Sequence, residues 1–214
     1  MEIIIVILSL FYILYLFFEK INLDKNRKNL KYIIHINGIR GKSTVSRLID
    51  AGLRAGGYKV FTKTTGTSPR IIDTNAKEFE INRQGKANIR EQISVITWAS
   101  KEKAEVLILE CMAVKPELQY VCENKILKSD IVAITNVRED HLDEMGDSLD
   151  KIADSLSNTI PKKATFFTAD KNYFNFFKNR CEDKNTRAFL SKNIKNEYWE
   201  IDFPNNIALA MDIC

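Results

Sequence analysis

The spacing of apolar residues along this chain alternates between two periods. Short apolar runs of strand length lie at residues 32–36, 58–62, 104–110, 130–135, 165–168 and 187–190. Between them, apolar residues at three- and four-residue spacing predict helices at residues 45–53, 89–99, 116–122, 149–160 and 171–180. Strands that alternate with helices are typical of right-handed crossovers and a mostly parallel sheet. We therefore predict an α/β fold with helices flanking that sheet.

The first residues depart from this alternation. Residues 3–18 read IIIVILSLFYILYLFF, and the adjoining residues extend the run to nearly the length of a membrane-spanning helix. A signal peptide would carry a basic start and a small-residue cleavage site, whereas this chain starts Met-Glu and shows no such site. A buried core helix is the other alternative, and a stretch that is apolar on all sides at a terminus disfavours it. We predict a transmembrane anchor over residues 1–20.

The net charge of +4 comes from one short segment. Residues 20–31 hold five basic residues and one acid, and the rest of the chain is balanced. This pattern indicates a basic juxtamembrane linker over residues 21–31, which places the following domain in the cytoplasm and the anchor in the cytoplasmic membrane. It lacks the broad basic face of a nucleic-acid-binding protein. The 4 cysteines form no C-x-x-C pair, so we interpret them as buried or incidental thiols.

Residues 37–44, NGIRGKST, form the strongest local motif. The motif follows a predicted strand and opens a predicted helix, which is where a phosphate-binding loop belongs. Glycines let backbone N–H groups converge on phosphate oxygens, lysine supplies positive charge, and a hydroxyl can contact Mg²⁺. Ile36 stands where the strict G-x-x-x-x-G-K-[ST] pattern has its first glycine. The candidate nucleotide-binding residues are Asn37, Gly38, Arg40, Gly41, Lys42, Ser43 and Thr44.

Acidic and histidine side chains follow two other predicted strands. Glu110 ends the run VLIL, and His141 lies in NVREDHLD after the run IVAIT. The carboxyl ends of parallel strands meet at the ligand-binding edge of an open α/β sheet. Glu110 is therefore a candidate Mg²⁺ contact, and Asp140 with His141 could position a metal or a phosphate. His35 lies inside a strand, and we interpret it as structural.

Four segments in one order resemble the Mur ligase superfamily, which includes the peptidoglycan amino-acid ligases and folylpolyglutamate synthase. The segments are NGIRGKSTV, KTTGTSPR, ECM and NVREDHLD. Within the superfamily the chain is most similar to the ligase subunits of bacterial poly-γ-glutamate (capsule) synthases, the PgsB/CapB type. The FPNN-x-A-L-A stretch near the end and the apolar start also match that type, and the superfamily loop lacks the first glycine too.

The resemblance implies a P-loop NTPase-like Mur ligase central domain over residues 32–214 and an ATP-dependent amide-forming ligase. ATP and Mg²⁺ are the implied cofactors, and glutamate and the growing poly-γ-glutamate the implied substrates. The γ-phosphate would pass to a glutamate carboxylate, and the amine of another glutamate would attack the acyl phosphate. Other membrane subunits of a synthesis and export complex are the implied partners. The implied site consists of Lys42 and His141 for catalysis, Ser43, Ser68, Glu110 and His141 for metal, and Asn206 for adenine.

Two departures from the superfamily pattern affect what is expected. Leu156 stands where many members carry a carbamylated lysine, so a second magnesium held in that way is not expected. Complete members continue into a C-terminal domain that closes over ATP, whereas this sequence stops at Cys214. We expect such a chain to bind ATP weakly and to ligate poorly or not at all by itself.

Two other function classes stay open at this stage. A non-catalytic, membrane-anchored ATP-binding module, or a decayed fragment of a ligase, would share the loop and lack the reaction. A signalling or transport nucleotide hydrolase is disfavoured, because TNVRED lacks the Asn-Lys-x-Asp pattern of guanine recognition. Amide formation by the chain, alone or with a supplied C-terminal half, separates the ligase from the binding module.

Overall fold

Eight β-strands make one sheet in the computed structural model, which describes residues 2–66, 68–83, 85, 87–192 and 203–214. The strands are β1 (Tyr32–Asn37), β2 (Val60–Lys63), β3 (Arg70–Ile72), β4 (Glu78–Glu80), β5 (Val106–Glu110), β6 (Ile131–Ile134), β7 (Thr165–Thr168) and β8 (Arg187–Leu190). The helices are α1 (Glu2–Lys28), α2 (Lys42–Ala55), α3 (Glu91–Lys101), α4 (Pro116–Val121), the π-helix η1 (Cys122–Leu127), α5 (Leu142–Met145), α6 (Leu149–Ser157), α7 (Phe174–Glu182) and α8 (Pro204–Ile213).

The strand order is β4-β3-β2-β5-β1-β6-β7-β8. The pairs β2–β5, β5–β1, β1–β6, β6–β7 and β7–β8 are parallel. The predicted mostly parallel α/β sheet is therefore confirmed. The antiparallel strands β3 and β4 were not predicted. They are three residues long, and β4 reads Glu-Phe-Glu, which is too short and too polar for the apolar pattern to indicate.

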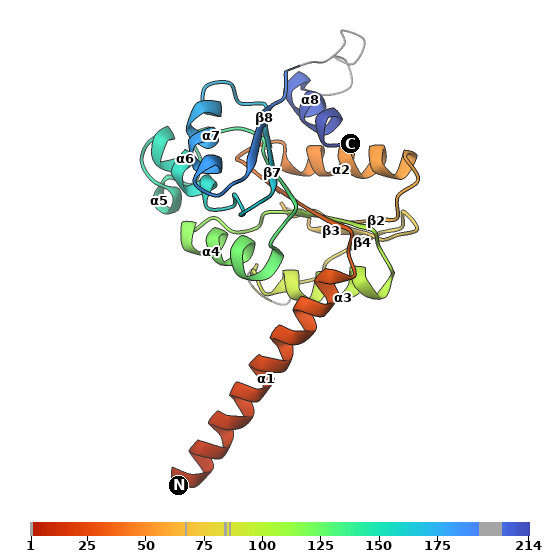
Figure 1. The fold of residues 1–214 in the computed structure, drawn as a ribbon, viewed down its shortest axis with the longest axis vertical. Coiled ribbons are helices and arrows are strands. Elements are labelled where there is room, and N and C mark those ends of the chain that lie inside the picture. Colours follow the sequence, from red (N-terminus) through yellow and green to blue (C-terminus); the bar gives the residue numbers. More distant parts are fainter. Residues whose placement is uncertain (1, 67, 84, 86, 193–202) are drawn as a thin grey trace.

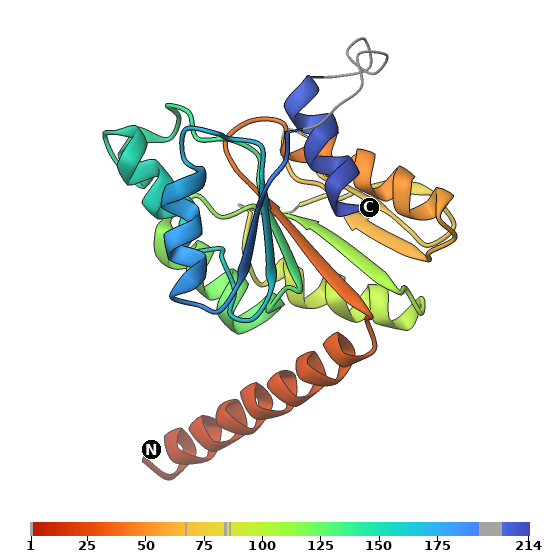
Figure 2. The same cartoon turned by 45° about the horizontal axis from the view of Figure 1, so that its top comes forward.

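Helices cover both faces of the sheet, because alternate side chains of each strand point to opposite sides. In β1, Ile34 and Ile36 pack against Val45 and Ile49 of α2 and against Leu209 of α8. On the other face, β1, β2 and β5 pack against α3 and η1, whereas β6 and β7 pack against α6 and α7. Figures 1 and 2 show α2 and α8 on one side of the sheet and α3, α4, α6 and α7 on the other.

Helix α1 runs without a break through the predicted anchor and most of the predicted linker, and it projects from the body as a single rod (Figure 1). Among the described residues it is the one helix long and apolar enough to cross a membrane. None of its apolar window is buried, so the alternative of a core helix is wrong. Its last two turns dock on α3, where Asn26 bonds Thr97 and Ser100 at 3.2 Å each. The basic segment therefore continues the helix into the domain.

Candidate functional site

The loop between β1 and α2 takes a shape that only glycine adopts easily at two positions. Gly38 has φ +118°, and an added Cβ would lie 2.2 Å from Thr135 Oγ1. Gly41 has φ +84°, and an added Cβ would lie 2.8 Å from Asn206 Oδ1. Ile36 is still paired within the sheet, to Glu110 on one side and Ala133 on the other. The loop therefore begins at Gly38, two residues after the position where the strict motif has its first glycine, and an isoleucine fits at that position within the strand.

The predicted metal contacts Ser43 and Glu110 are in direct contact. Ser43 Oγ donates a hydrogen bond of 2.8 Å to Glu110 Oε2, and the Thr65 N–H donates one of 2.7 Å to the same oxygen. Glu110 is only 2% exposed, at the end of β5 beside the loop. The sheet register therefore brings an acid and a hydroxyl from distant parts of the chain to one point.

The ammonium of Lys42 folds back over the loop. Its Nζ donates to the carbonyl oxygens of Gly38 at 2.8 Å and Ile39 at 3.3 Å. Both acceptors are neutral carbonyls of the loop itself. Among the described residues no acid forms an ion pair with Lys42, so it carries an uncompensated positive charge at the start of α2, where free backbone N–H groups also favour an anion.

His141 lies on the far side of the same site. It adopts a left-handed conformation with φ +50° at the start of α5, and its side chain is half exposed. Its neighbour Asp140 accepts the His141 N–H at 2.9 Å and an ion pair from Arg40 Nη2, also at 2.9 Å. Arg40 thus joins the phosphate loop to the segment that carries His141.

A cavity of about 270 Å³ brings several of these residues together. Lys42, Glu110 and His141 all line it, and Gly38 and Asn37 form part of its wall. The sequence predicted that these residues share the edge of the sheet, and the structure confirms that they meet. The remaining wall consists of Ile39, Thr65, Gly66, Arg83, Ala87, Cys111, Met112, Ala113, Val114 and Met145.

A second hollow, of about 380 Å³, lies on the other side of the loop. Thr44 and Asn206 line it with Gly41, whereas the neighbouring Lys42 lines the first cavity. Asn206, in the first turn of α8, is nearly buried and packs against the α-carbon of Gly41. The two hollows flank the loop, which is the arrangement a nucleotide needs if its phosphates and its base lie on opposite sides.

Asn37 braces the loop. Its Oδ1 accepts the Gly38 N–H at 2.8 Å, and its Nδ2 donates to Gln119 Oε1 at 2.8 Å and Thr159 Oγ1 at 3.2 Å. The side chain is 2% exposed. Both polar ends of the Asn37 side chain are therefore hydrogen-bonded within the protein. A role of Asn37 in nucleotide binding stays a prediction, and its backbone would have to provide it.

Ser68 and Leu156 lie apart from this site. Ser68 is exposed and donates to Glu80 Oε1 at 3.3 Å on the β3–β4 hairpin, away from the lining of the cavity. Leu156 belongs to α6 and is fully buried in the core.

A buried ionic network behind the cavity was not predicted from the sequence. Lys63, at the end of β2, is completely buried, and its Nζ lies 2.7 Å from Glu91 Oε1 and 3.1 Å from Gln92 Oε1. Glu91 also accepts two hydrogen bonds from Arg83, from Nε at 2.8 Å and Nη2 at 3.0 Å. Burial lowers the pKa of Lys63, and Glu91 partly opposes that shift. Lysine is seldom buried, so no pattern signalled this role.

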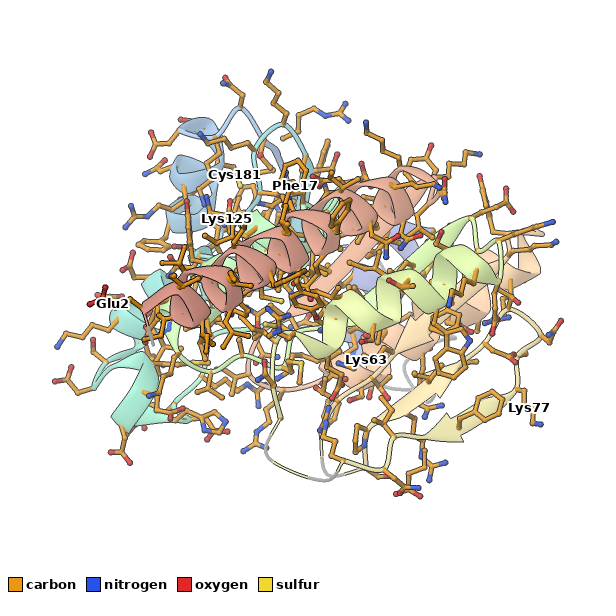
Figure 3. All side chains as sticks on the ribbon, turned by 90° about the horizontal axis from the view of Figure 1, so that it is seen from below. Glu2, Phe17, Lys63, Lys77, Lys125 and Cys181 are labelled. Carbon is orange, nitrogen blue, oxygen red and sulfur yellow. The ribbon has the colours of Figure 1, made fainter. Side chains whose placement is uncertain are left out.

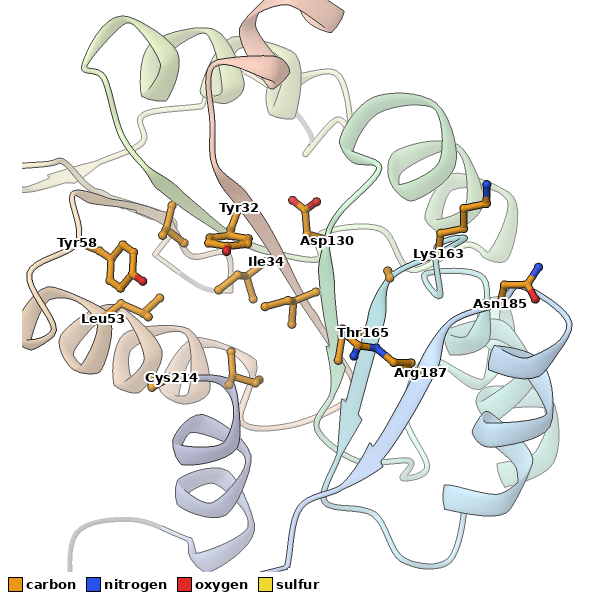
Figure 4. A pocket seen from close by; sticks show the side chains of 14 residues that line it. Tyr32, Ile34, Leu53, Tyr58, Asp130, Lys163, Thr165, Asn185, Arg187 and Cys214 are labelled. Atoms are coloured by element: carbon orange, nitrogen blue, oxygen red, sulfur yellow. The ribbon is translucent and has the colours of Figure 1, made fainter.

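Two wider hollows lie away from the loop. One, of about 610 Å³, opens at the amino ends of the central strands beside Tyr32, Tyr58, Asp130 and Cys214 (Figure 4). Because the phosphate loop follows the carboxyl end of β1, this hollow lies at the opposite edge of the sheet. The other, of about 670 Å³, lies between α1 and α3. None of the predicted site residues lines either hollow.

The fold and the loop define a mostly parallel α/β domain of the folylpolyglutamate synthase type. The structure resembles a folylpolyglutamate synthase/dihydrofolate synthase from Yersinia pestis complexed with AMPPNP and Mn (TM-score 0.63, 17% identity, 80% of this chain and 46% of that one). It also resembles E. coli FolC in complex with ADP (TM-score 0.64, 15% identity, 83% and 49%). At these identities the likeness concerns the fold.

Residues 36–209 match the family described as the Mur ligase middle domain, and the chain belongs to that family. It is 38% identical to the capsule biosynthesis protein CapB of Bacillus anthracis, over 97% of this chain and 46% of that protein. It is 39% identical to the PGA synthase CapB of Bacillus subtilis (strain 168), over 91% and 52%. The chain thus spans about half the length of the curated relatives it matches.

Proposed function

We propose that this chain is the ATP-binding part of an ATP-dependent acid–amino-acid ligase that makes amide bonds in poly-γ-glutamate or capsule synthesis. Its identity to proteins named for capsule biosynthesis and PGA synthesis supports the pathway. The observation that carries the proposal is the contact between loop residue Ser43 and the strand-end acid Glu110, beside the uncompensated Lys42. Phosphoryl transfer needs this combination of positioned positive charge and metal-binding oxygens.

ATP binds across the loop in this proposal. The backbone from Gly38 to Gly41 and the start of α2 hold the β- and γ-phosphates, and Lys42 moves from the loop carbonyls to the γ-phosphate. Ser43 bonds Glu110, which lines the phosphate cavity, and Thr44 lines the second hollow. Asn206 borders that second hollow, which makes it the place for the adenine ring. Arg40 supports the loop through its ion pair with Asp140.

The oxygen donors at the site fit Mg²⁺ that is shared with a triphosphate. Mg²⁺ binds oxygen ligands and is commonly held by one or two protein groups plus phosphate oxygens. The described residues contain no group of three or more His, Cys, Asp or Glu that could hold a metal by themselves. Glu110 and Ser43 would supply the protein oxygens, and His141 lines the same cavity as Glu110. When bound, the ion would neutralise charge on the phosphates.

The proposed reaction has two steps. A carboxylate oxygen of glutamate attacks the γ-phosphorus, the bond to the β-phosphate oxygen breaks, and ADP leaves. The amine of a second glutamate then attacks the acyl carbon, an amide forms, and phosphate leaves with a proton released to solvent. Lys42 stabilises the charge on the transferring group, and His141, which lines the same cavity, is the second proposed catalytic residue. Glutamate and the growing poly-γ-glutamate are the proposed substrates.

We also propose that α1 anchors the domain in the cytoplasmic membrane, where other membrane subunits of a synthesis and export complex assemble with it. The apolar run and the basic residues that follow support this placement. Removing residues 2–20 is expected to release the protein from alkali-washed membranes into the soluble fraction. Release of the intact chain by the same wash would contradict the anchor.

An assay of ADP formation distinguishes the proposed ligase from an ATP-binding module that catalyses no reaction. We expect the chain to form ADP slowly when Mg²⁺-ATP and glutamate are both present, and faster when the C-terminal half of a longer relative is added. Domain closure over ATP gates reactions of this kind, which is why the added half should matter. ADP is measured with a coupled assay, with glutamate omitted as the control. If ATP binds but glutamate has no effect in either mixture, the binding module is the better account.

A further inference from the structure

The phosphate cavity contains a second fixed positive charge that the proposed ATP site does not use. Among its described lining residues, Lys42 and Arg83 carry a permanent charge of this sign. Lys42 belongs to the phosphate loop, whereas Arg83 comes from the segment between β4 and α3. An arginine at a cavity wall is suited to a planar anion, because its guanidinium donates parallel hydrogen bonds.

The guanidinium of Arg83 is held in place from behind. Glu91 accepts from its Nε and Nη2, so these two donors fix the plane of the group. Among the described residues, no partner is present for Nη1. Half-buried and fixed on one edge, Arg83 can present its remaining donors to a ligand with little further loss of side-chain entropy.

The support for Arg83 is itself rigid. Glu91 is also bound by Lys63, which is completely buried and lies beside α3 in Figure 3. Gln92 completes the surroundings of the Lys63 ammonium. The three charges of Lys63, Glu91 and Arg83 leave a net positive charge at the wall of the cavity. An anion that enters the cavity is therefore attracted to this wall and is not repelled by Glu91.

The wall of the cavity beyond Arg83 is largely apolar. Met112, Ala113 and Val114 follow Glu110 along the chain and line it, together with Ile39 and Met145. A short aliphatic chain would lie well on such a surface, since it buries methylene groups there. The cavity therefore combines two separated cationic groups with an apolar surface, which is the complement of a dicarboxylate whose acid groups are joined by methylenes.

We propose that Arg83 binds the non-reacting carboxylate of a dicarboxylate substrate and so orients its other carboxylate toward Lys42 and Glu110. This inference rests on the proposed ligase function and adds the subsite that selects the acid substrate. For a γ-glutamyl chain, the group at Arg83 is the α-carboxylate of the residue whose other carboxylate is activated. Monocarboxylic acids and α-amidated glutamyl chains lack the group that Arg83 recognises.

The test uses γ-linked triglutamate as the probe. The full chain in detergent is saturated with Mg²⁺ and a non-hydrolysable ATP analogue, and triglutamate is titrated in a calorimeter. Arg83→Gln is expected to weaken triglutamate binding about 10- to 100-fold, the worth of a charge-assisted bidentate contact. Affinity for the ATP analogue should change less than about 2-fold. Arg90→Gln is the matched control, because Arg90 is exposed, pairs with Glu19 and lies outside the cavity lining.

A second probe and a second variant make the outcome specific. Triglutamate with its α-carboxylates amidated should bind the unaltered chain as weakly as Arg83→Gln binds triglutamate, and the two losses should not add. Arg83→Lys keeps the charge and should recover part of the affinity. The inference is overturned if Arg83→Gln behaves as Arg90→Gln, if amidation has no effect, or if the unaltered chain binds the ATP analogue but no triglutamate. Absence of ATP-analogue binding would instead refute the proposed function and this subsite with it.

Discussion

Replacing Glu91 by alanine is expected to lower the free energy of unfolding by about 3–5 kcal/mol, because it leaves the ammonium of Lys63 buried without a counter-charge. Lys63 has no exposed surface, and its other contacts are the neutral Gln92 Oε1 and the sulfur of Met112, at 3.5 Å. Neither replaces a carboxylate at 2.7 Å. Urea denaturation of the full chain in detergent measures the loss.

A matched control and a rescue identify the cause of this loss. Glu78 pairs with Arg47 and Arg70 on the surface, so Glu78→Ala should cost about 1 kcal/mol or less. Adding Lys63→Met to Glu91→Ala removes the unpaired charge and should restore most of the lost stability. A double variant as unstable as Glu91→Ala would show that the loss comes from packing around α3.

The same network makes the fold sensitive to acid. Burial by itself would raise the pKa of Glu91, but the hydrogen bonds from Arg83 and Lys63 outweigh it and lower the pKa below the usual 4.5. A carboxyl group whose pKa is lowered by folding stabilises the folded state above its unfolded pKa. That contribution is full above about pH 4.5 and is lost as the pH falls through the lower, folded value. The stability lost on acidification should be smaller in the Lys63→Met/Glu91→Ala variant.

Lys42→Ala is expected to weaken ATP binding about 10- to 100-fold while leaving the stability of the chain nearly unchanged. In the structure its ammonium bonds only neutral loop carbonyls, so little folded-state energy depends on it. With ATP bound, the same group would face the γ-phosphate. Lys178→Ala on α7 is the control, since Lys178 is an exposed lysine with a 3.9 Å ion pair to Glu182. Equal affinity in both variants would contradict the assigned role.

The central part of the site could be predicted because it depends on strand order. Residues that follow buried parallel strands meet at one edge of the sheet, so Glu110 and His141 were expected near the loop. The structure adds that Glu110 bonds Ser43 directly. The absent first glycine also has a physical reason, because Ile36 is still a paired residue of β1.

Other features could not be predicted because they depend on tertiary contacts. The stretch between β4 and α3 has no apolar period, so nothing in it pointed to Arg83. Lys63 lies in a motif quoted only for its resemblance, and its burial depends on Glu91, twenty-eight residues later. Ser68 was predicted from the same motif, but it is exposed just before β3 and bonds Glu80 of β4. The docking of α1 on α3 depends on Asn26 and Asn29, which look like ordinary polar linker residues in the sequence.

The most direct test of this account is a calorimetric titration of the full chain with ATP, with and without Mg²⁺, beside Lys42→Ala. The account predicts binding to one site per chain that strengthens when Mg²⁺ is present, because Ser43 and Glu110 place oxygen ligands beside the triphosphate. Lys42→Ala should lose most of that affinity. No binding of ATP by the unaltered chain, or binding that is indifferent to both Mg²⁺ and Lys42, would contradict the account.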